Sequence, residues 1–308
     1  MESFPESFLI MNNMISIIVS TYKPDLFSAF TENVAKNIGI EYEIITIENK
    51  GLMGLCEAYN KGIAQAKYQY ICFSHDDIRI NTQNWGQYII ETFNADKQLG
   101  MLGVAGGGYK PWMPSAWFFS GDQRFRRLNL TQTNLLTNES IKRIDNPNKL
   151  DGGLDEVVTL DGCWFCTNKE IVDTYKFDSE TFKGYHCYDI DYSLQVGQKY
   201  KLAVSFDLDI EHFSYGVFSS EWFIETMKLY KKWKNILPRS CDDPGKEEIC
   251  LCEYHAYCFN LSTAVKFSVS RKPLWGILLS VKALTLIGLP KWIQLLKITI
   301  VSYLNKSK

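Results

Sequence analysis

The first hundred residues alternate short apolar runs with longer segments in which apolar residues recur every three to four positions. Continuous apolar runs of five to nine residues are typical of buried strands, whereas the longer spacing indicates helices. An order of β-α-β-α-β-α-β predicts a parallel sheet with helices on both faces. The predicted strands are 15–21, 41–49, 68–74 and 101–108, and the predicted helices are 24–38, 54–66 and 85–96.

The pattern is less regular after residue 108. Residues 109–156 are rich in aromatic and Asn or Asp residues, and the stretch PWMPSAWFFSGD predicts either a mobile loop over a binding site or a packed insertion. Further strands are expected in 156–168 and 201–216, and further helices in 182–200, 219–235 and 245–266. We therefore divide the chain into an extension (1–14), an α/β domain with two halves (15–108 and 109–240) and a helical appendage (241–308).

Charge is distributed unevenly between the domain and the appendage. The net charge is -2, but the last acidic residue is Glu253, so residues 254–308 carry eight basic and no acidic side chains. An apolar run, 274–289, contains Lys282 and is too short for a comfortable membrane span, and Pro290 ends it. This pattern predicts helices that lie on an anionic membrane surface, or a pair of helices that pack on the domain.

Cysteine usage indicates a reducing compartment. The nine cysteines are an odd number in apolar contexts, and the first residues do not have the pattern of a secretory signal, so we expect a cytoplasmic protein. CWFC at 163–166 is interpreted as buried thiols. Cys250, Cys252, His255 and Cys258 have zinc-like spacing but lie in a predicted helix, where they would not converge on one ion.

Several nucleotide and nucleic-acid functions are not favoured. Neither a Gly-rich dinucleotide motif nor a P-loop follows the first strand. The basic residues of the appendage are interleaved with long aliphatic side chains, which does not favour nucleic-acid binding.

Polar side chains follow three of the predicted strands at their carboxyl ends, where parallel sheets place their ligand sites. Successive side chains of a strand point in opposite directions, so Asp76 and Asp77 cannot both face the core. Burying an unpaired carboxylate costs several kcal/mol, which predicts a bound Mg²⁺ or Mn²⁺ shared with substrate phosphates. The alternative is a turn or a helix N-cap. The residues of this candidate site are Ser20, Thr21, Tyr22, Glu48, Asn49, His75, Asp76 and Asp77.

These segments, taken in order, resemble the GT-A glycosyltransferases of family 2, and in particular the branch similar to the streptomycin-biosynthesis transferases. The resemblance spans about residues 14–235 and rests on SIIVSTYKP, IENKGLMGLCEAYNKGIAQAKYQYICFSHDDI, LDGCWFCTNKE, YDIDYSLQV and EHFSYG. It implies a GT-A type, Rossmann-like mixed sheet with helices on both faces. Two positions depart from the family pattern: Ser74 replaces the first Asp of the metal motif, and Tyr188 replaces the Glu of the usual Glu-Asp pair.

The resemblance also implies roles for individual residues. Asp76 would hold the metal, with Asp77 and His212 as further metal or diphosphate contacts. The nucleobase and donor contacts would be Ser20, Thr21, Tyr22, Glu48, Asn49, Asn60, Ser74, His75, Asp161 and Gly162. Trp117 and Trp164 are candidate acceptor contacts, and for Trp164, an aromatic residue in a strand, the alternative is a core position.

Transfer from a nucleotide sugar requires a Lewis acid for the departing diphosphate and a base for the incoming hydroxyl. Asp189 and Asp191 are the candidate bases; on a helix they diverge by about 200°, so only one can reach the acceptor. A base opposite the leaving group predicts inversion.

The expected function is therefore metal-dependent transfer, from a UDP-sugar by preference, to a glycan or a polyprenyl-diphosphate-linked acceptor. The expected setting is bacterial surface polysaccharide synthesis at the inner face of the cytoplasmic membrane. Two alternatives remain. A nucleotidyltransferase would carry a Gly-rich basic loop where this chain has STYKPD, and a non-catalytic sugar-nucleotide binder or assembly partner would explain the missing first Asp. The oligomeric state is left open.

Overall fold

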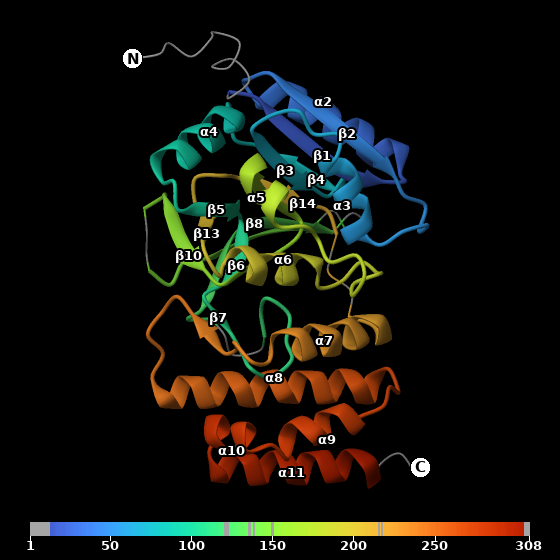
Figure 1. Ribbon diagram of the computed structural model, residues 1–308, viewed down its shortest axis with the longest axis vertical. Coiled ribbons are helices and arrows are strands. Elements are labelled where there is room, and N and C mark those ends of the chain that lie inside the picture. The colour runs from blue at the N-terminus through green and yellow to red at the C-terminus, as the bar shows by residue number, and fades with distance from the viewer. Residues whose placement is uncertain are drawn as a thin grey trace.

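The computed structural model describes residues 13–119, 123–134, 137, 139–148, 151–214, 216 and 218–304. Most of the predicted extension, 1–12, lies outside them. The alternation predicted for the first half is confirmed for its helices and first three strands (Figure 1), whereas the strand predicted at 101–108 is divided between two sheets and the short strand 78–80 was not predicted. These elements are β1 (Ile15–Thr21), α2 (Pro24–Asn37), β2 (Tyr42–Glu48), α3 (Leu55–Ile63), β3 (Tyr70–Ser74), α4 (Trp85–Ala95) and β5 (Leu99–Gly103).

The main sheet has seven strands in the order β10-β13-β5-β12-β3-β1-β2. β3, β1 and β2 are parallel neighbours, while β12 (Trp164–Asn168) lies antiparallel between β3 and β5. β13 (Lys201–Ser205) and β10 (Leu154–Val157) complete it. The mixed sheet expected from the resemblance is therefore confirmed.

A second sheet lies beside the first and carries part of the site. Its order is β11-β6-β8-β14-β4, and β9 pairs with β8. β14 runs antiparallel to β4, with His212 opposite Ile78 in the register, so the end of β14 lies next to the residues that follow β3. The strands are β4 (Ile78–Ile80), β6 (Ala105–Gly107), β8 (Arg126–Asn134), β9 (Glu139–Asp145), β11 (Thr159–Leu160) and β14 (Ile210–His212).

Alternation along the central strands fills a separate core on each face of the main sheet. Ile18 and Phe73 pack with residues of α3, α6 (Tyr188–Val196) and α7 (Ser220–Trp233). Ile17 and Cys72 point the other way and pack with residues of α2 and α4. This is the arrangement of a sheet covered on both faces, in which every side chain of a central strand meets a helix.

Two cysteines on neighbouring strands are joined. Cys72 of β3 and Cys166 of β12 are partners in the antiparallel register and form a disulfide. The interpretation of CWFC at 163–166 as buried thiols is therefore wrong for Cys166, whereas Cys163 is a buried free cysteine. The sequence could not show this, because the partners are 94 positions apart along the chain.

The appendage is helical, as predicted, and its helices stack in layers beyond α7 (Figure 1). α8 contacts α7 on one side and α10 and α11 on the other. Within the described residues no single helix has the length and composition of a membrane span; α10 and α11 together do, but they are bent by 118°. The helices are α8 (Lys246–Lys266), α9 (Lys272–Leu278), α10 (Val281–Ile287) and α11 (Leu289–Leu304), and α5 (Lys169–Thr174) lies in the domain. A short pair, β7 (Tyr109–Lys110) and β15 (Arg239–Ser240), completes the structure.

The segment after β7 is packed by a buried carboxylate on α8. Glu253 accepts hydrogen bonds from the Tyr109 hydroxyl (2.8 Å) and from the backbone N–H groups of Trp112 (2.8 Å) and Met113 (2.7 Å). Lys110 is buried beside it and donates to the carbonyl of Ser115 (2.8 Å). The described part of PWMPSAWFFSGD, 111–119, is therefore packed against α8; the alternative that it covers a binding site stays open, because Trp117 and Phe118 line a cavity.

Candidate active site

Three ligand-type side chains converge where β3 ends. The Oδ1 atom of Asp77 lies 3.7 Å from Nδ1 of His75 and 3.4 Å from Nε2 of His212. The donor atoms of the three residues all lie within 4.8 Å of one another. His75 and Asp77 lie in the short connection between β3 and β4, and the β4–β14 register brings His212 to them.

The protonation states of this group suit a metal ion. Burial opposes ionisation of Asp77, but the imidazoles of His212 and His75 hold its pKa well below the ordinary value. Burial lowers the pKa of His75, which favours the neutral ring that can act as a ligand. Asp77 Oδ1 is buried and accepts no hydrogen bond from the described residues. An unsatisfied carboxylate oxygen between two imidazoles therefore fits a divalent cation, and the nitrogen ligands favour a transition metal over Mg²⁺.

Asp76 points elsewhere. Its Oδ2 accepts a hydrogen bond of 2.5 Å from the Thr21 hydroxyl at the end of β1. The structure thus places Asp77, and not Asp76, beside the two histidines, while Asp76 faces the nucleotide half; the predicted metal contact of Asp76 stays a prediction. Burial raises the pKa of Asp76 despite the Thr21 hydrogen bond.

A cavity of about 530 Å³ adjoins the cluster. His75 and His212 form part of its wall, and Asp161 and Asp189 form another part. Its remaining lining is largely aromatic and aliphatic, with two arginines, and includes Trp117, Phe118, Phe218, Trp222, Leu128, Leu130, Arg126 and Arg143.

Asp189 is tuned to ionise near neutrality. Its Oδ2 accepts a hydrogen bond of 3.0 Å from the backbone N–H of Gly162. Burial and the neighbouring carboxylate of Asp161 raise the pKa of Asp189 to about 7. Asp161 is itself fixed by the Trp117 indole (2.5 Å) and the N–H of Cys163 (2.8 Å). A carboxylate with this pKa on a cavity wall has the properties of a general base.

Asp191 lies on another side of α6, as the helical divergence of the two aspartates predicts. It is buried, accepts a hydrogen bond of 2.8 Å from the Trp233 indole and lies 2.8 Å from Nζ of Lys232. Its candidacy as a base is therefore corrected: Asp191 ties α6 to α7 and is absent from the cavity lining.

Tyr188 links the two halves of the site, a role that the sequence analysis missed. Its hydroxyl lies 3.0 Å from Nε2 of His75 and donates to the carbonyl of Gly162 at 3.0 Å. A Cβ atom at Gly162 would lie only 2.0 Å from this hydroxyl, so only glycine fits here. The departure from the family pattern at position 188 was the available signal.

The residues expected to hold the nucleotide and donor divide into three groups. Tyr22 and Glu48 are exposed at strand ends, Thr21 is buried, and His75, Asp161 and Gly162 line the cavity. The other four, Ser20, Asn49, Asn60 and Ser74, use their side-chain polar atoms inside the fold. Ser74 donates to the carbonyl of His75, Asn49 bonds Ser20 and both backbone groups of Met53, and Asn60 bonds both backbone groups of Phe177.

The two tryptophans expected to contact the acceptor have different environments. Trp117 lines the cavity. Trp164 is 1% exposed, belongs to the core on the α4 side of the sheet and packs edge-on against Trp85. Its predicted contact with an acceptor is therefore wrong, because alternation along β12 turns it away from the site.

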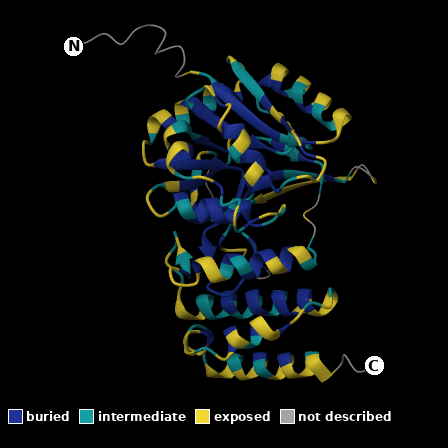
Figure 2. Ribbon diagram, turned by 45° about the vertical axis from the view of Figure 1, so that its right-hand side comes forward, coloured by how far each residue is buried: buried dark blue, intermediate teal, exposed yellow. Residues whose placement is uncertain are grey.

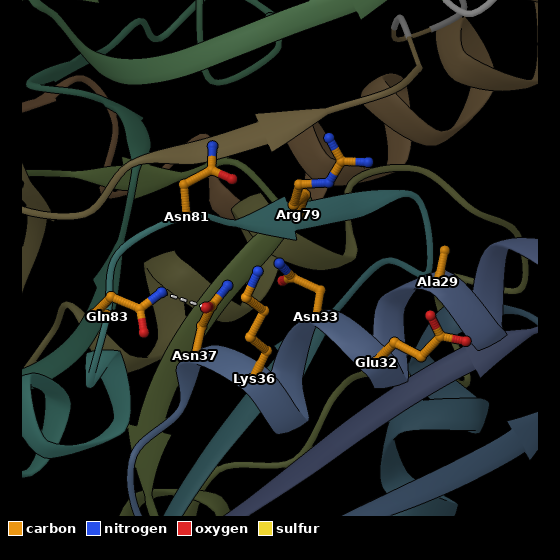
Figure 3. Close-up of a pocket in the computed structure, with 8 residues that line it drawn as sticks. All are labelled: Ala29, Glu32, Asn33, Lys36, Asn37, Arg79, Asn81 and Gln83. Atoms are coloured by element: carbon orange, nitrogen blue, oxygen red, sulfur yellow. Dashed lines mark hydrogen bonds between the residues drawn. The ribbon is translucent and has the colours of Figure 1, made fainter.

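A second depression, of about 430 Å³, lies along α2 and shares no lining residue with the first (Figure 3). Asn33 and Asn37 from α2 are used to bond the backbone of Ile80, and Gln83 donates to Asn37. Its polar side chains thus hold α2 to β4, and this region adds no chemistry to the site.

One family model and two solved structures are similar to this chain. The model of a family described as "Glycosyltransferase like family" matches residues 16–233. No curated protein matches the chain. The fold is similar to that of GalNAc-T7, solved with UDP, GalNAc and Mn²⁺, with a TM-score of 0.50 and 10% identity. The match covers 72% of this chain but only 49% of that one.

A second similar structure is the mannosyltransferase PcManGT from Pyrobaculum calidifontis, solved with GDP-Man and Mn²⁺. Its TM-score is 0.45 at 11% identity, and the match covers 94% of this chain and 86% of that one. The chain thus has the GT-A type fold expected from its sequence.

Proposed function

Since this chain belongs to the glycosyltransferase-like family and is an enzyme of glycosyl transfer, we propose that it is a metal-dependent, inverting transferase that uses a nucleotide sugar. One observation carries the proposal. His75 and His212 of the Asp77 cluster line the same cavity as Asp189, whose pKa is raised. Stabilisation of a leaving diphosphate and removal of a proton are thereby available at one place.

Asp77, His75 and His212 would hold a divalent ion, Mn²⁺ in preference to Mg²⁺. When bound, this ion supplies Lewis-acid stabilisation of the diphosphate that departs. Thr21 and Asp76, with exposed Tyr22 and Glu48, lie on the nucleotide side and would contact the ribose and base. The GT-A relative GalNAc-T7 was solved with UDP and Mn²⁺, which supports testing UDP-sugars first.

Asp189 would remove the proton from the acceptor hydroxyl. At the same time the hydroxyl oxygen would bond to the anomeric carbon of the donor sugar, and the bond from that carbon to the diphosphate would break. The Gly162 N–H positions this carboxylate, and Asp161 keeps its pKa high. With Asp189 acting as a base and not as a nucleophile, the displacement would be a single step and the anomeric configuration would invert.

The cavity lining supports a glycan acceptor. The faces of Trp117, Phe118 and Phe218 suit sugar rings, and Arg143 suits the phosphates of a polyprenyl-diphosphate carrier, whereas Arg126 is paired with Asp145. We accordingly assign the protein to bacterial surface polysaccharide synthesis as part of this proposal.

Incubation with a panel of UDP-, GDP- and dTDP-sugars and Mn²⁺ tests the proposal by release of the nucleoside diphosphate. We expect release with at least one donor, its loss on chelation, and its loss in Asp77→Asn. Asp189→Asn should bind the donor and fail to transfer, and the matched control Asp173→Asn, an exposed aspartate of α5, should be unaffected. Binding without release in the unaltered protein would favour a non-catalytic binder, and pyrophosphate release from a nucleoside triphosphate with a sugar phosphate would favour a nucleotidyltransferase.

A further inference from the structure

The helices beyond α8 have apolar residues on their inner side. Leu278, Ile287 and Leu295 are buried, and Thr299 bonds Tyr257 of α8 at 3.0 Å. These contacts attach α9–α11 to the rest of the chain. The inner side of α9–α11 is therefore packed within the fold, against α8.

The outer side of α11 is apolar as well. Since the helix buries Leu295 and Thr299, its opposite line runs through Ile293, Lys297 and Ile300. Ten residues of α11 are exposed, and seven of them are large hydrophobic residues. A helix with one face in water is expected to be polar there, so this composition indicates that something covers the face.

Neighbouring helices extend the same surface. Leu279 is 61% exposed, Val281 is 81% exposed, and Leu284 is also exposed. Figure 2 shows exposed residues along the outermost helix, at the end of the molecule remote from the N-terminus. We define the α9–α11 face as Leu279, Val281, Leu284, Leu289, Ile293, Ile298, Ile300, Val301, Tyr303 and Leu304.

Charge identifies what covers this face. Residues 254–308 carry eight basic and no acidic side chains, and Lys272 and Lys297 are exposed, whereas the ammonium group of Lys282 donates to the carbonyls of Lys234 and Leu237. A second copy of the chain would bring the same positive charge to the contact, whereas anionic headgroups would neutralise it. The bend of 118° between α10 and α11 is suited to helices that lie along a surface.

We propose that the α9–α11 face docks on the surface of an anionic phospholipid bilayer, with its apolar side chains inserted among the acyl chains and its lysines at the headgroups. This inference does not rest on the proposed function, because lipid binding needs neither donor nor acceptor. The anionic leaflet of a cell is the cytoplasmic one, so docking places the protein at the inner face of the membrane. If the proposed activity is also correct, a lipid-linked acceptor would be held at the same boundary.

Flotation of the full-length protein with vesicles tests the inference. We expect it to float with vesicles of mixed phosphatidylcholine and phosphatidylglycerol and to remain below with phosphatidylcholine alone. Binding should weaken by about 5-fold for each of Lys272→Gln and Lys297→Gln, and also in high salt. The triple variant Val281→Ser, Ile300→Ser, Leu304→Ser should weaken it by about 100-fold.

The replaced side chains are exposed, so these variants should keep the circular dichroism spectrum and melting temperature of the unaltered protein. Leu52→Ser, at an equally exposed leucine in the nucleotide half, is the matched control and should bind vesicles normally. The inference is overturned if the protein ignores anionic vesicles or if the triple variant binds them equally well. It is also overturned if the protein forms a dimer that the triple variant dissociates, because a second copy would then be the occupant.

Discussion

The pH dependence of transfer is the prediction that follows most closely from the geometry of Asp189. Burial and Asp161 raise the pKa of this carboxylic acid from 3.8 to about 7. A base must be ionised to accept a proton, so kcat/KM should rise with pH up to about 7 and level off above it. At pH 5.5 a group with a pKa of about 7 is ionised to only about 3%, so kcat/KM should be about 30-fold below its plateau.

Release of nucleoside diphosphate at subsaturating donor, measured from pH 5.5 to 8.5 with Mn²⁺ present, reports this pKa in the free enzyme. Asp189→Asn should lower the plateau by about 10²- to 10⁴-fold and leave donor affinity near normal. The matched control Asp173→Asn should keep both the plateau and the profile. A profile that is flat down to pH 5.5 would mean that Asp189 has an ordinary pKa or is not the base, and would refute its assignment.

The same carboxyl group should affect stability in the opposite direction. A raised pKa means that the folded state binds the proton more tightly than the unfolded chain does, so stability falls as pH rises from about 4 to about 7. The interval from 3.8 to about 7 corresponds to about 4 kcal/mol as an upper limit. Denaturant unfolding of Asp189→Asn should show part of this penalty removed at pH 8 and little change at pH 4.

Three other substitutions test separate parts of the structure. Asp77→Asn should weaken Mn²⁺ binding by at least about 10-fold in calorimetry, since it removes the charged ligand, and unchanged affinity would place the ion elsewhere. Asp191→Ala should lower the free energy of unfolding by about 2 kcal/mol, because it leaves the Trp233 indole without its partner. It should keep the pH profile of transfer, and a shifted profile would argue that Asp191 takes part in catalysis. Glu253→Ala should lower the free energy of unfolding by about 3 kcal/mol, because it leaves two backbone N–H groups unpaired. It should also raise KM for the acceptor, because these N–H groups belong to the segment that carries Trp117. An unchanged KM would show that this segment keeps its conformation without Glu253.

Hydrophobic periodicity was sufficient for the helices and the central strands of the nucleotide half, because each central strand and its covering helix are apolar on the faces that meet, but it did not separate β4 and β6 as strands of their own. It failed for β8 and β9. The residues of β9 are almost all exposed, so β9 has no apolar face to recognise and was expected to be loop. The Cys72–Cys166 pairing and the position of His212 depend on registers between strands that are far apart in the sequence.

Site assignments failed where neighbouring side chains diverge or are already bonded. Asp76 and Asp77 lie in the connection between β3 and β4 and contact different partners, and the choice between them depends on the position of His212, which the sequence does not show. Glu253 appeared in the sequence only as the last acidic residue; its position within the apolar stretch LCEYHAYCF was the signal of a buried structural carboxylate. Asn60 and Asp191 have ordinary ligand-type side chains whose bonds to Phe177 and to α7 became visible only in the folded chain.

The metal cluster is tested most directly by anomalous diffraction from a crystal grown with MnCl₂ and a nucleoside diphosphate. We predict one strong manganese peak within about 2.5 Å of the Asp77 carboxylate, with His212 or His75 and the diphosphate as its neighbours. A peak on Asp76 alone, or density for the nucleotide with no manganese beside Asp77, would contradict the assignment of the metal to the Asp77 cluster.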